Sequence, residues 1–211
     1  MIIDYENGNE FLKENLEFLN TNEYLTTFFK LNAPSILSKS KSNYAIKCEN
    51  NGYKLVTLRM QPYSTLFFGD LECINELVSY LIKNKYELNN YLCELSLGNK
   101  ISDVLLNEYQ FDFYEALAMD FMKATQISEP SSYEIITANG EDIDDIIQCI
   151  NMFTSECGLN NNVSKEKVIQ EISSYRVIKK DGKIASMAKI APSTSHDLKI
   201  SEVYTKKNIE A

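Results

Sequence analysis

Apolar residues recur at helical spacing at the start of the chain. Residues 9–19 place their apolar side chains on one helical face, and residues 22–38 repeat the pattern. Two strands are predicted next within residues 43–61, on either side of Asn51-Gly52, because this pair supplies the positive-φ residues of a tight hairpin turn. The chain is therefore expected to open with two helices and a hairpin.

Alternating and helical patterns then succeed one another up to a polar connector. The predicted elements are a strand at 64–70, a helix at Leu71–Lys83, a strand at 91–97, a helix at Lys100–Tyr109 and a long strand at 113–125. The connector, "ISEPSS", contains Pro130 and has strand-like text on both sides. We place a domain boundary there, which gives domains at residues 1–128 and 129–211.

The second domain follows the order βααβββ. Its predicted elements are a strand at Tyr133–Thr137, a helix within 138–158, a helix at Ser164–Ser173, a hairpin around Asp181-Gly182 and a last strand at 197–205. The acidic residues 141–145 suit the positive end of a helix dipole and lack the spacing of a calcium loop. They are interpreted as a helix start.

Composition narrows the classes of function. The chain has 44% hydrophobic residues, enough for one large or two small cores, and a net charge of -9, which disfavours general binding to nucleic acid. No apolar run approaches the length of a membrane span. The first residues also lack the basic start and apolar core that are typical of a signal peptide. We expect a cytoplasmic protein without membrane or nucleic-acid partners.

Cysteine and histidine give little support for metal or nucleophilic chemistry. The five cysteines form no CxxC pair, so neither a metal site nor a disulfide is expected. The single histidine, His196, lies in a Ser/Thr/Pro-rich loop, and a catalytic triad would have to be built around it. Cys157 is interpreted as a small apolar residue at a helix end, since no residue nearby in the sequence could serve as the base that a nucleophilic thiol needs.

The amino-acid sequence of the last two predicted strands resembles that of a known family. "SMAKIAPSTSHDLKISEVYT" is similar to a pattern of two-domain proteins of the GNAT N-acetyltransferase family, where a strand beginning Ser-Met-Ala precedes a loop and a strand ending Val-Tyr-Thr. "LVTLRMQPYSTLFFGD" resembles a segment of the partner domain of those proteins. The resemblance implies an α/β fold of the α+β kind, with mixed, mostly antiparallel sheets flanked by helices.

The resemblance also implies an activity. A GNAT domain moves an acetyl group from acetyl-CoA to an amine, here of a small molecule or a peptide. In that family a glycine-rich loop follows the Val-Tyr-Thr strand, whereas Glu210-Ala211 stand where Arg and Gly are expected. We therefore expect an N-terminal GNAT-like domain and the first half of a second GNAT domain, cut before its pyrophosphate loop and impaired in activity.

The resemblance places the coenzyme on the backbone of Val203, Tyr204 and Thr205. Glu202 is a candidate general base, and Glu156 is a candidate catalytic residue facing the substrate cleft. Each assignment has a plain alternative. The first three are good strand formers, Glu202 can be an exposed edge residue, and Glu156 can be a solvated residue at a helix end. A second hypothesis for the whole chain is a non-catalytic binding or scaffold module, or the remnant of a disrupted acetyltransferase gene. An open sheet edge also predicts homo-oligomers.

Overall fold

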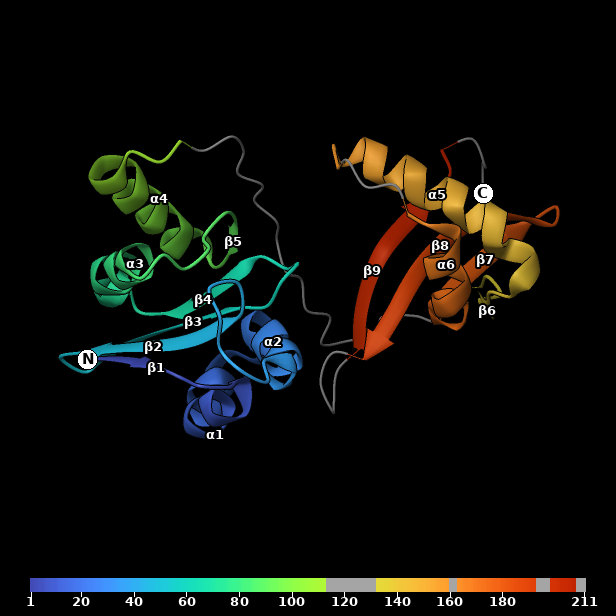
Figure 1. Ribbon diagram of the computed structural model, residues 1–211. Helices are drawn as coiled ribbons and strands as arrows, with labels where there is room; N and C mark the ends of the chain where they lie inside the picture. The colour runs from blue at the N-terminus through green and yellow to red at the C-terminus, as the bar shows by residue number, and fades with distance from the viewer. Residues whose placement is uncertain (113–131, 160–162, 193–197, 208–211) are drawn as a thin grey trace. The chain divides into compact units, whose positions relative to one another are not determined.

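The computed structural model describes residues 1–112, 132–159, 163–192 and 198–207 (Figure 1). The chain divides into two compact units, Met1–Met122 (unit 1) and Lys123–Ala211 (unit 2). The connector around Pro130 and the strand predicted at 113–125 lie outside the described residues. Each unit is therefore treated by itself below.

Unit 1 contains a five-stranded sheet, sheet A, in the order β1-β2-β3-β4-β5 (Figure 1). Neighbouring strands are antiparallel except β4 and β5, which are parallel. The elements are β1 Ile2–Asp4, α1 Gly8–Leu19, α2 Glu23–Asn32, β2 Tyr44–Asn50, β3 Tyr53–Arg59, β4 Thr65–Gly69, α3 Ile74–Lys83, β5 Tyr91–Leu92 and α4 Leu95–Tyr109. The fold is thus of the α+β kind, as predicted.

Sheet A is covered on both faces. Val56 belongs to the core with residues of α1 and α2, such as Phe11, while its neighbour Leu55 belongs to the core with α3 and α4. Successive residues of a strand point to opposite faces, so a continuous apolar run marks a strand buried on both sides. This explains why Leu55, Val56 and Leu58 of the central strand β3 are all apolar and buried, with the buried polar residue Thr57 between them.

Several predictions for unit 1 are confirmed and others are wrong. The hairpin turn is present, with φ of 51° at Asn51 and 87° at Gly52. The strand predicted at 91–97 spans only Tyr91–Leu92, and α4 begins at Leu95 rather than Lys100. The buried face of α4 has apolar residues at helical spacing: Leu97, Ile101, Val104 and Leu105. The short alternation of apolar and polar residues in "YLCELSL" concealed this spacing. The short edge strand β1 was not predicted.

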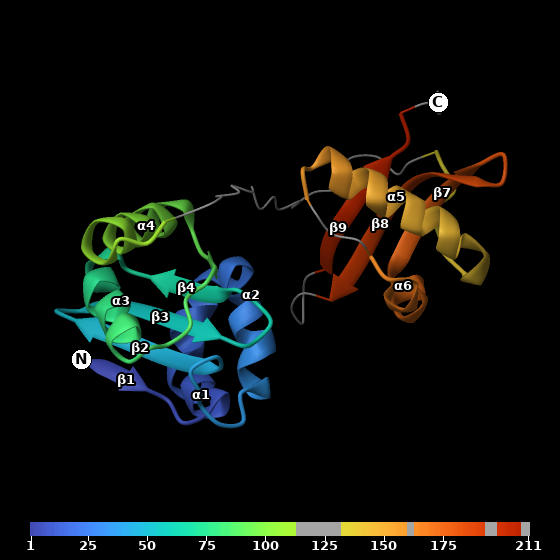
Figure 2. The same ribbon diagram turned by 45° about the horizontal axis from the view of Figure 1, so that its top comes forward.

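Unit 2 contains a four-stranded antiparallel sheet, sheet B, in the order β6-β7-β8-β9. Figure 2 shows β7, β8 and β9 side by side. Its elements are β6 Ile136–Thr137, α5 Ile143–Glu156, α6 Lys165–Glu171, β7 Tyr175–Lys180, β8 Lys183–Pro192 and β9 Leu198–Thr205. The predicted order βααβββ is confirmed, and so is the hairpin turn, with positive φ at Asp181 and Gly182. Asp142 completes a capping box with Asn139 just before α5, in the acidic segment interpreted as a helix start.

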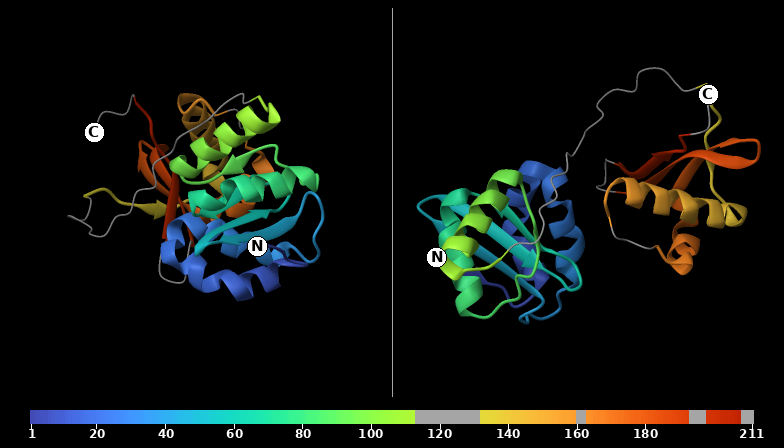
Figure 3. Two further views of the ribbon diagram at one scale, coloured as in Figure 1. Left: turned by 90° about the vertical axis from the view of Figure 1, so that its left-hand side faces the viewer. Right: turned by 90° about the horizontal axis from the view of Figure 1, so that it is seen from above.

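The helices of unit 2 lie on one side of sheet B (Figure 3). Tyr175, Val177 and Met187 pack there against Ile146 and Ile150 of α5. None of the helices in the described ranges is long and apolar enough to cross a membrane.

The two units repeat the same topology. Unit 1 runs β1-α1-α2-β2-β3-β4 and unit 2 runs β6-α5-α6-β7-β8-β9, and in both the strands follow one another across the sheet in chain order. Unit 1 then continues with α3, β5 and α4. By this correspondence β9 of unit 2 occupies the place that β4 has in unit 1.

Candidate functional site

β9 is an edge strand of sheet B and carries a β-bulge. Met187 pairs with Tyr204 and Lys189 pairs with Ser201, so that Glu202 and Val203 together face Ala188 alone. Glu202 has a φ of 51°, in the left-handed region that side chains other than glycine rarely adopt. Bulges of this kind leave backbone groups unpaired and recur beside active sites.

The free edge of β9 presents backbone groups of two residues predicted to bind the coenzyme. The N–H of Lys206 donates to the carbonyl of Ala185 at 2.9 Å, across the β8–β9 ladder. Along an antiparallel strand, the backbone groups of successive residues point alternately toward the neighbouring strand and away from it. The N–H and C=O of Thr205 and Val203 therefore point away from β8. Those of Tyr204 point toward β8.

The carboxylate of Glu202 lies in a polar cluster on the helix-covered side of sheet B. The hydroxyl of Tyr175 donates to Glu202 Oε2 at 2.8 Å, and Lys189 Nζ lies 3.5 Å from Glu202 Oε1. Lys189 Nζ also donates to Glu171 Oε2 of α6 at 2.6 Å. The cluster therefore joins α6 to β7, β8 and β9.

Charge and burial define the protonation states in this cluster. Burial and the hydrogen bond to Glu202 raise the pKa of Tyr175, so its hydroxyl keeps its proton at neutral pH. Burial acts against the charge of Lys189, but Glu171 and Glu202 outweigh it and raise its pKa. Glu202 thus faces a proton donor and an ammonium group.

Glu156 lies at the end of α5 and has different partners. The hydroxyl of Tyr204 donates to Glu156 Oε1 at 3.3 Å, and Lys207 Nζ lies 3.2 Å from the same atom. The Tyr204 side chain is buried in the core of unit 2. The structure therefore brings Glu156 next to Tyr204 and Glu202 next to Tyr175.

A third carboxylate, which the sequence did not single out, ties α5 to the ends of two strands. Asp145 Oδ2 accepts from the N–H of Ile184 at 2.7 Å, and Lys206 Nζ donates to Asp145 Oδ1 at 2.5 Å. Cys149, one turn along α5, is buried, and burial raises the pKa of its thiol. A thiol with a raised pKa is a poor nucleophile at neutral pH.

The sequence did not predict that Tyr175 and Lys189 pair, because this pairing depends on a second bulge. Lys180 and Lys183 pair next to the turn, and a regular hairpin that continued from this pair would place Tyr175 opposite Ala188. The bulge between Ile178 and Lys179 shifts the register by one residue and pairs Tyr175 with Lys189. No local signal in the sequence marks this shift.

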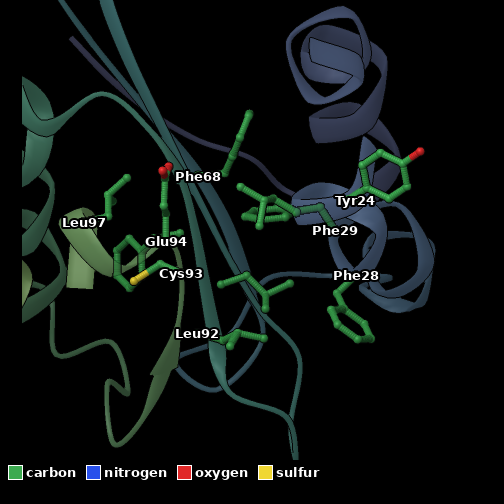
Figure 4. Close-up of a pocket in the computed structure, with 11 residues that line it drawn as sticks. Tyr24, Phe28, Phe29, Phe68, Leu92, Cys93, Glu94 and Leu97 are labelled. Carbon is green, nitrogen blue, oxygen red and sulfur yellow. The ribbon is translucent and has the colours of Figure 1, made fainter. Parts of the chain in front are cut away.

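A small cavity lies against β4 in unit 1, at the place that corresponds to the edge of β9 (Figure 4). Its volume is about 30 Å³, far below the roughly 300 Å³ or more of a typical ligand site. Phe28 and Phe29 of α2, Phe68 of β4 and Leu92 of β5 are among its lining residues. Aromatic side chains and β5 therefore fill this space in unit 1, whereas in the described part of unit 2 no strand pairs with the other edge of β9.

The described residues contain no group of three or more His, Cys, Asp or Glu side chains that could hold a metal ion. The loop with His196 lies outside the described residues. No family model matches this sequence, and no curated protein matches it significantly.

Proposed function

We propose that unit 2 belongs to an N-acetyltransferase, which moves an acetyl group from acetyl-CoA to an amine of a small molecule or peptide. The resemblance of the Ser-Met-Ala and Val-Tyr-Thr segments and the order of elements support this proposal. The observation that carries it is the bulged edge of β9, where Val203 and Thr205 turn backbone groups outward.

The edge suits the extended arm of the coenzyme. The pantetheine of acetyl-CoA contains two amides, which can pair with a strand edge as an added peptide strand does. Thr205 and Val203 lie on the same side of the strand, two residues apart, and each offers one donor and one acceptor. The bulge at Glu202 ends this regular pairing and marks the place where the thioester would lie.

Acetyl transfer needs a base and a place for negative charge. The amine nitrogen attacks the thioester carbonyl, the C–N bond forms, the C–S bond breaks, and the departing thiolate takes a proton while the amine loses one. Glu202 is the first candidate to take the amine proton because it lies in the bulge, and Glu156 is the second. The hydrogen bond from Tyr175 would hold Glu202 in position during this step.

Coenzyme binding through the edge alone should be weak. In the described part of unit 2, no helix begins after β9 whose free N–H groups could bind a pyrophosphate. Each charge-assisted hydrogen bond of that kind contributes about 1.5–3 kcal/mol. We expect a Kd in the millimolar range, which corresponds to only about 4 kcal/mol of binding free energy.

The five cysteines are all free, as is usual in a reducing compartment. This is in keeping with the cytoplasm, which we propose as the location of the enzyme.

A matched pair of variants tests the edge. Thr205→Pro removes the outward N–H, whereas Thr205→Ala keeps it, and both lose the same hydroxyl contact with Ser186. In an NMR titration with acetyl-CoA, the original chain and Thr205→Ala should show saturable shifts at Val203, and Thr205→Pro should show none. Equal binding by both variants, or micromolar affinity of the original chain, would contradict the assignment of this edge.

A non-catalytic binding or scaffold module is the second candidate. It is favoured by the fact that both candidate bases already have partners, Tyr175 and Lys189 for Glu202, and Tyr204 and Lys207 for Glu156. Absence of any acetyl-CoA binding in the same titration would support it.

A further inference from the structure

Two cysteine side chains from distant parts of the chain meet in the core of unit 1. Cys48 lies on β2, and Cys73 ends a short 3-10 helix, η3, which spans Leu71–Cys73 just before α3. Both side chains are fully buried in the core that α3 and α4 form with sheet A, and both are free thiols. Their spacing in the sequence did not predict a pair, because the contact depends on how β2, β3 and β4 fold together.

Backbone contacts hold η3 close to β2. The N–H of Lys54 donates to Asp70 Oδ2 at 2.7 Å, and the N–H of Asp70 donates to the carbonyl of Lys54 at 2.8 Å. Lys54 pairs across the ladder with Glu49, which is the neighbour of Cys48 in β2. Cα atoms of η3 therefore come within 8 Å of Cα atoms of β2. Bridged cysteines have Cα atoms about 4.4–6.8 Å apart, so the backbone already has the approach that a disulfide needs.

The two thiols lie close enough for each to shift the pKa of the other. Burial, together with the neighbouring Cys73 and Glu76, raises the pKa of Cys48 to about 12. Burial also raises the pKa of Cys73, but hydrogen bonds from the Cys48 thiol and from the N–H of Asn50 oppose this shift. Cys73 is therefore the better placed of the two to react first as a thiolate.

The pair lies beneath a short edge strand of unit 1. Ile2 of β1 pairs directly with Cys48, and β1 has only three residues at the edge of sheet A. Such a strand opens locally at a low cost in free energy. The side chain of Glu76, which adjoins Cys48, is 38% exposed. A small oxidant can therefore reach the thiols without unfolding of the whole sheet.

We propose that Cys48 and Cys73 form a reversible disulfide when hydrogen peroxide is present. The Cys73 sulfur attacks one peroxide oxygen, the O–O bond breaks, and the products are a sulfenic acid and one water molecule, which carries away the thiol proton. The Cys48 sulfur then attacks the sulfenic sulfur, the S–O bond breaks, and the hydroxide leaves as a second water with the Cys48 proton. Two electrons pass from the thiols to the peroxide, and a small dithiol restores both thiols by exchange.

The disulfide would join β2 to the start of α3. It closes a loop from residue 48 to residue 73, and this loop contains β3 and β4. A cross-link of this kind restricts the unfolded chain and thereby stabilises the folded one. We expect the unfolded fraction of unit 1 to fall about tenfold or more on oxidation. The inference concerns unit 1 alone and is independent of the acetyl transfer proposed for unit 2.

Mass spectrometry on the full chain tests the pairing. The folded protein is treated with hydrogen peroxide, its remaining thiols are alkylated, and the product is digested. We expect two peptides joined through Cys48 and Cys73, which dithiothreitol separates. The exposed Cys157 shows in the same sample that the oxidant has acted.

Urea unfolding of unit 1 tests the effect on stability. Peroxide should raise the midpoint of the original chain and of the matched control Cys93→Ala, which removes another cysteine of unit 1 whose pKa burial raises to about 12. It should not raise the midpoint of Cys48→Ala or Cys73→Ala. If these two variants do not fold, the linked peptides of the original chain decide the question.

Three results would overturn the proposal. The first is the absence of linked peptides in a sample whose Cys157 is oxidised. The second is a link between Cys48 and Cys73 that forms only after unfolding in urea, which would show that the folded core keeps the thiols apart or out of reach. The third is a lower urea midpoint of the linked chain, which would show that the disulfide strains the fold.

Discussion

Glu202 shows how single residues hold the shape of the candidate site. An L-residue in the left-handed region is less stable by about 1–2 kcal/mol, and the hydrogen bond from Tyr175 and the nearby Lys189 offset this cost. Glycine would adopt the same conformation without strain but would lose both contacts. The residue is therefore suited to the bulge by its side-chain partners and not by its backbone preference.

Asp145 should make the stability of unit 2 depend on pH. Burial opposes its charge, but Lys206 and the N–H of Ile184 outweigh burial and lower its pKa. Because the pKa of Asp145 is lower in the folded protein than in the unfolded chain, where it is about 3.9, ionised Asp145 stabilises the fold above that pH. This contribution is lost as the pH falls through the pKa of the folded state. Asp145→Asn should lower the free energy of unfolding of unit 2 by about 2 kcal/mol at pH 7, and the difference should shrink below about pH 4.

Urea unfolding of unit 2 across that pH range measures the effect. Asp144→Asn is the matched control, because Asp144 is 82% exposed and pairs with Lys165 at the surface. It should change little at any pH. A pH profile of Asp145→Asn parallel to that of the original chain would contradict the assigned role.

At the scale of elements, one close contact positions α1 against the turn after α2. The N–H of Gly8 donates to the carbonyl of Ile36 at 2.9 Å, and a Cβ at position 8 would lie 1.8 Å from the carbonyl oxygen of Ala33. Only glycine fits there, because the obstructing atoms belong to the backbone.

Gly8→Ala should therefore destabilise unit 1 by about 3 kcal/mol or more. Gly140→Ala, at the turn before α5, should stay within about 0.5 kcal/mol, since nothing lies within 4 Å of its added Cβ and its φ is not positive. The midpoints of urea unfolding compare the two. Equal midpoints would mean that the start of α1 can shift without cost.

At the scale of the whole molecule, each unit has a core of its own. Unit 1 has two hydrophobic cores, one on each face of sheet A, and unit 2 has a single core between sheet B and its helices. Their sequences do not interleave, so either unit can unfold while the other remains folded.

Limited proteolysis followed by mass spectrometry should give two protected fragments, with cleavage near the polar connector, at residues 125–135. In the Gly8→Ala variant only the N-terminal fragment should become sensitive to protease. Simultaneous loss of both fragments in that variant would show that the two units unfold together.

The sequence by itself determined the local features of this fold. Asn51-Gly52 and Asp181-Gly182 predicted both hairpin turns, and apolar periodicity predicted α1, α5 and the order βααβββ. These features depend on residues close together in the chain, and their backbone preferences and spacing can be read from the amino-acid sequence.

Tertiary structure decided what depends on distant residues. The bulges that pair Tyr175 with Lys189 and place Glu202 at the edge shift the register by one residue, and strand pairing and core packing select that shift, not local propensity. The start of α4 at Leu95 was set by burial against the core with α3, which overrode a strand-like alternation. The topology that the two units share became visible only in the folded structure, because strand order depends on pairings between residues far apart in the chain.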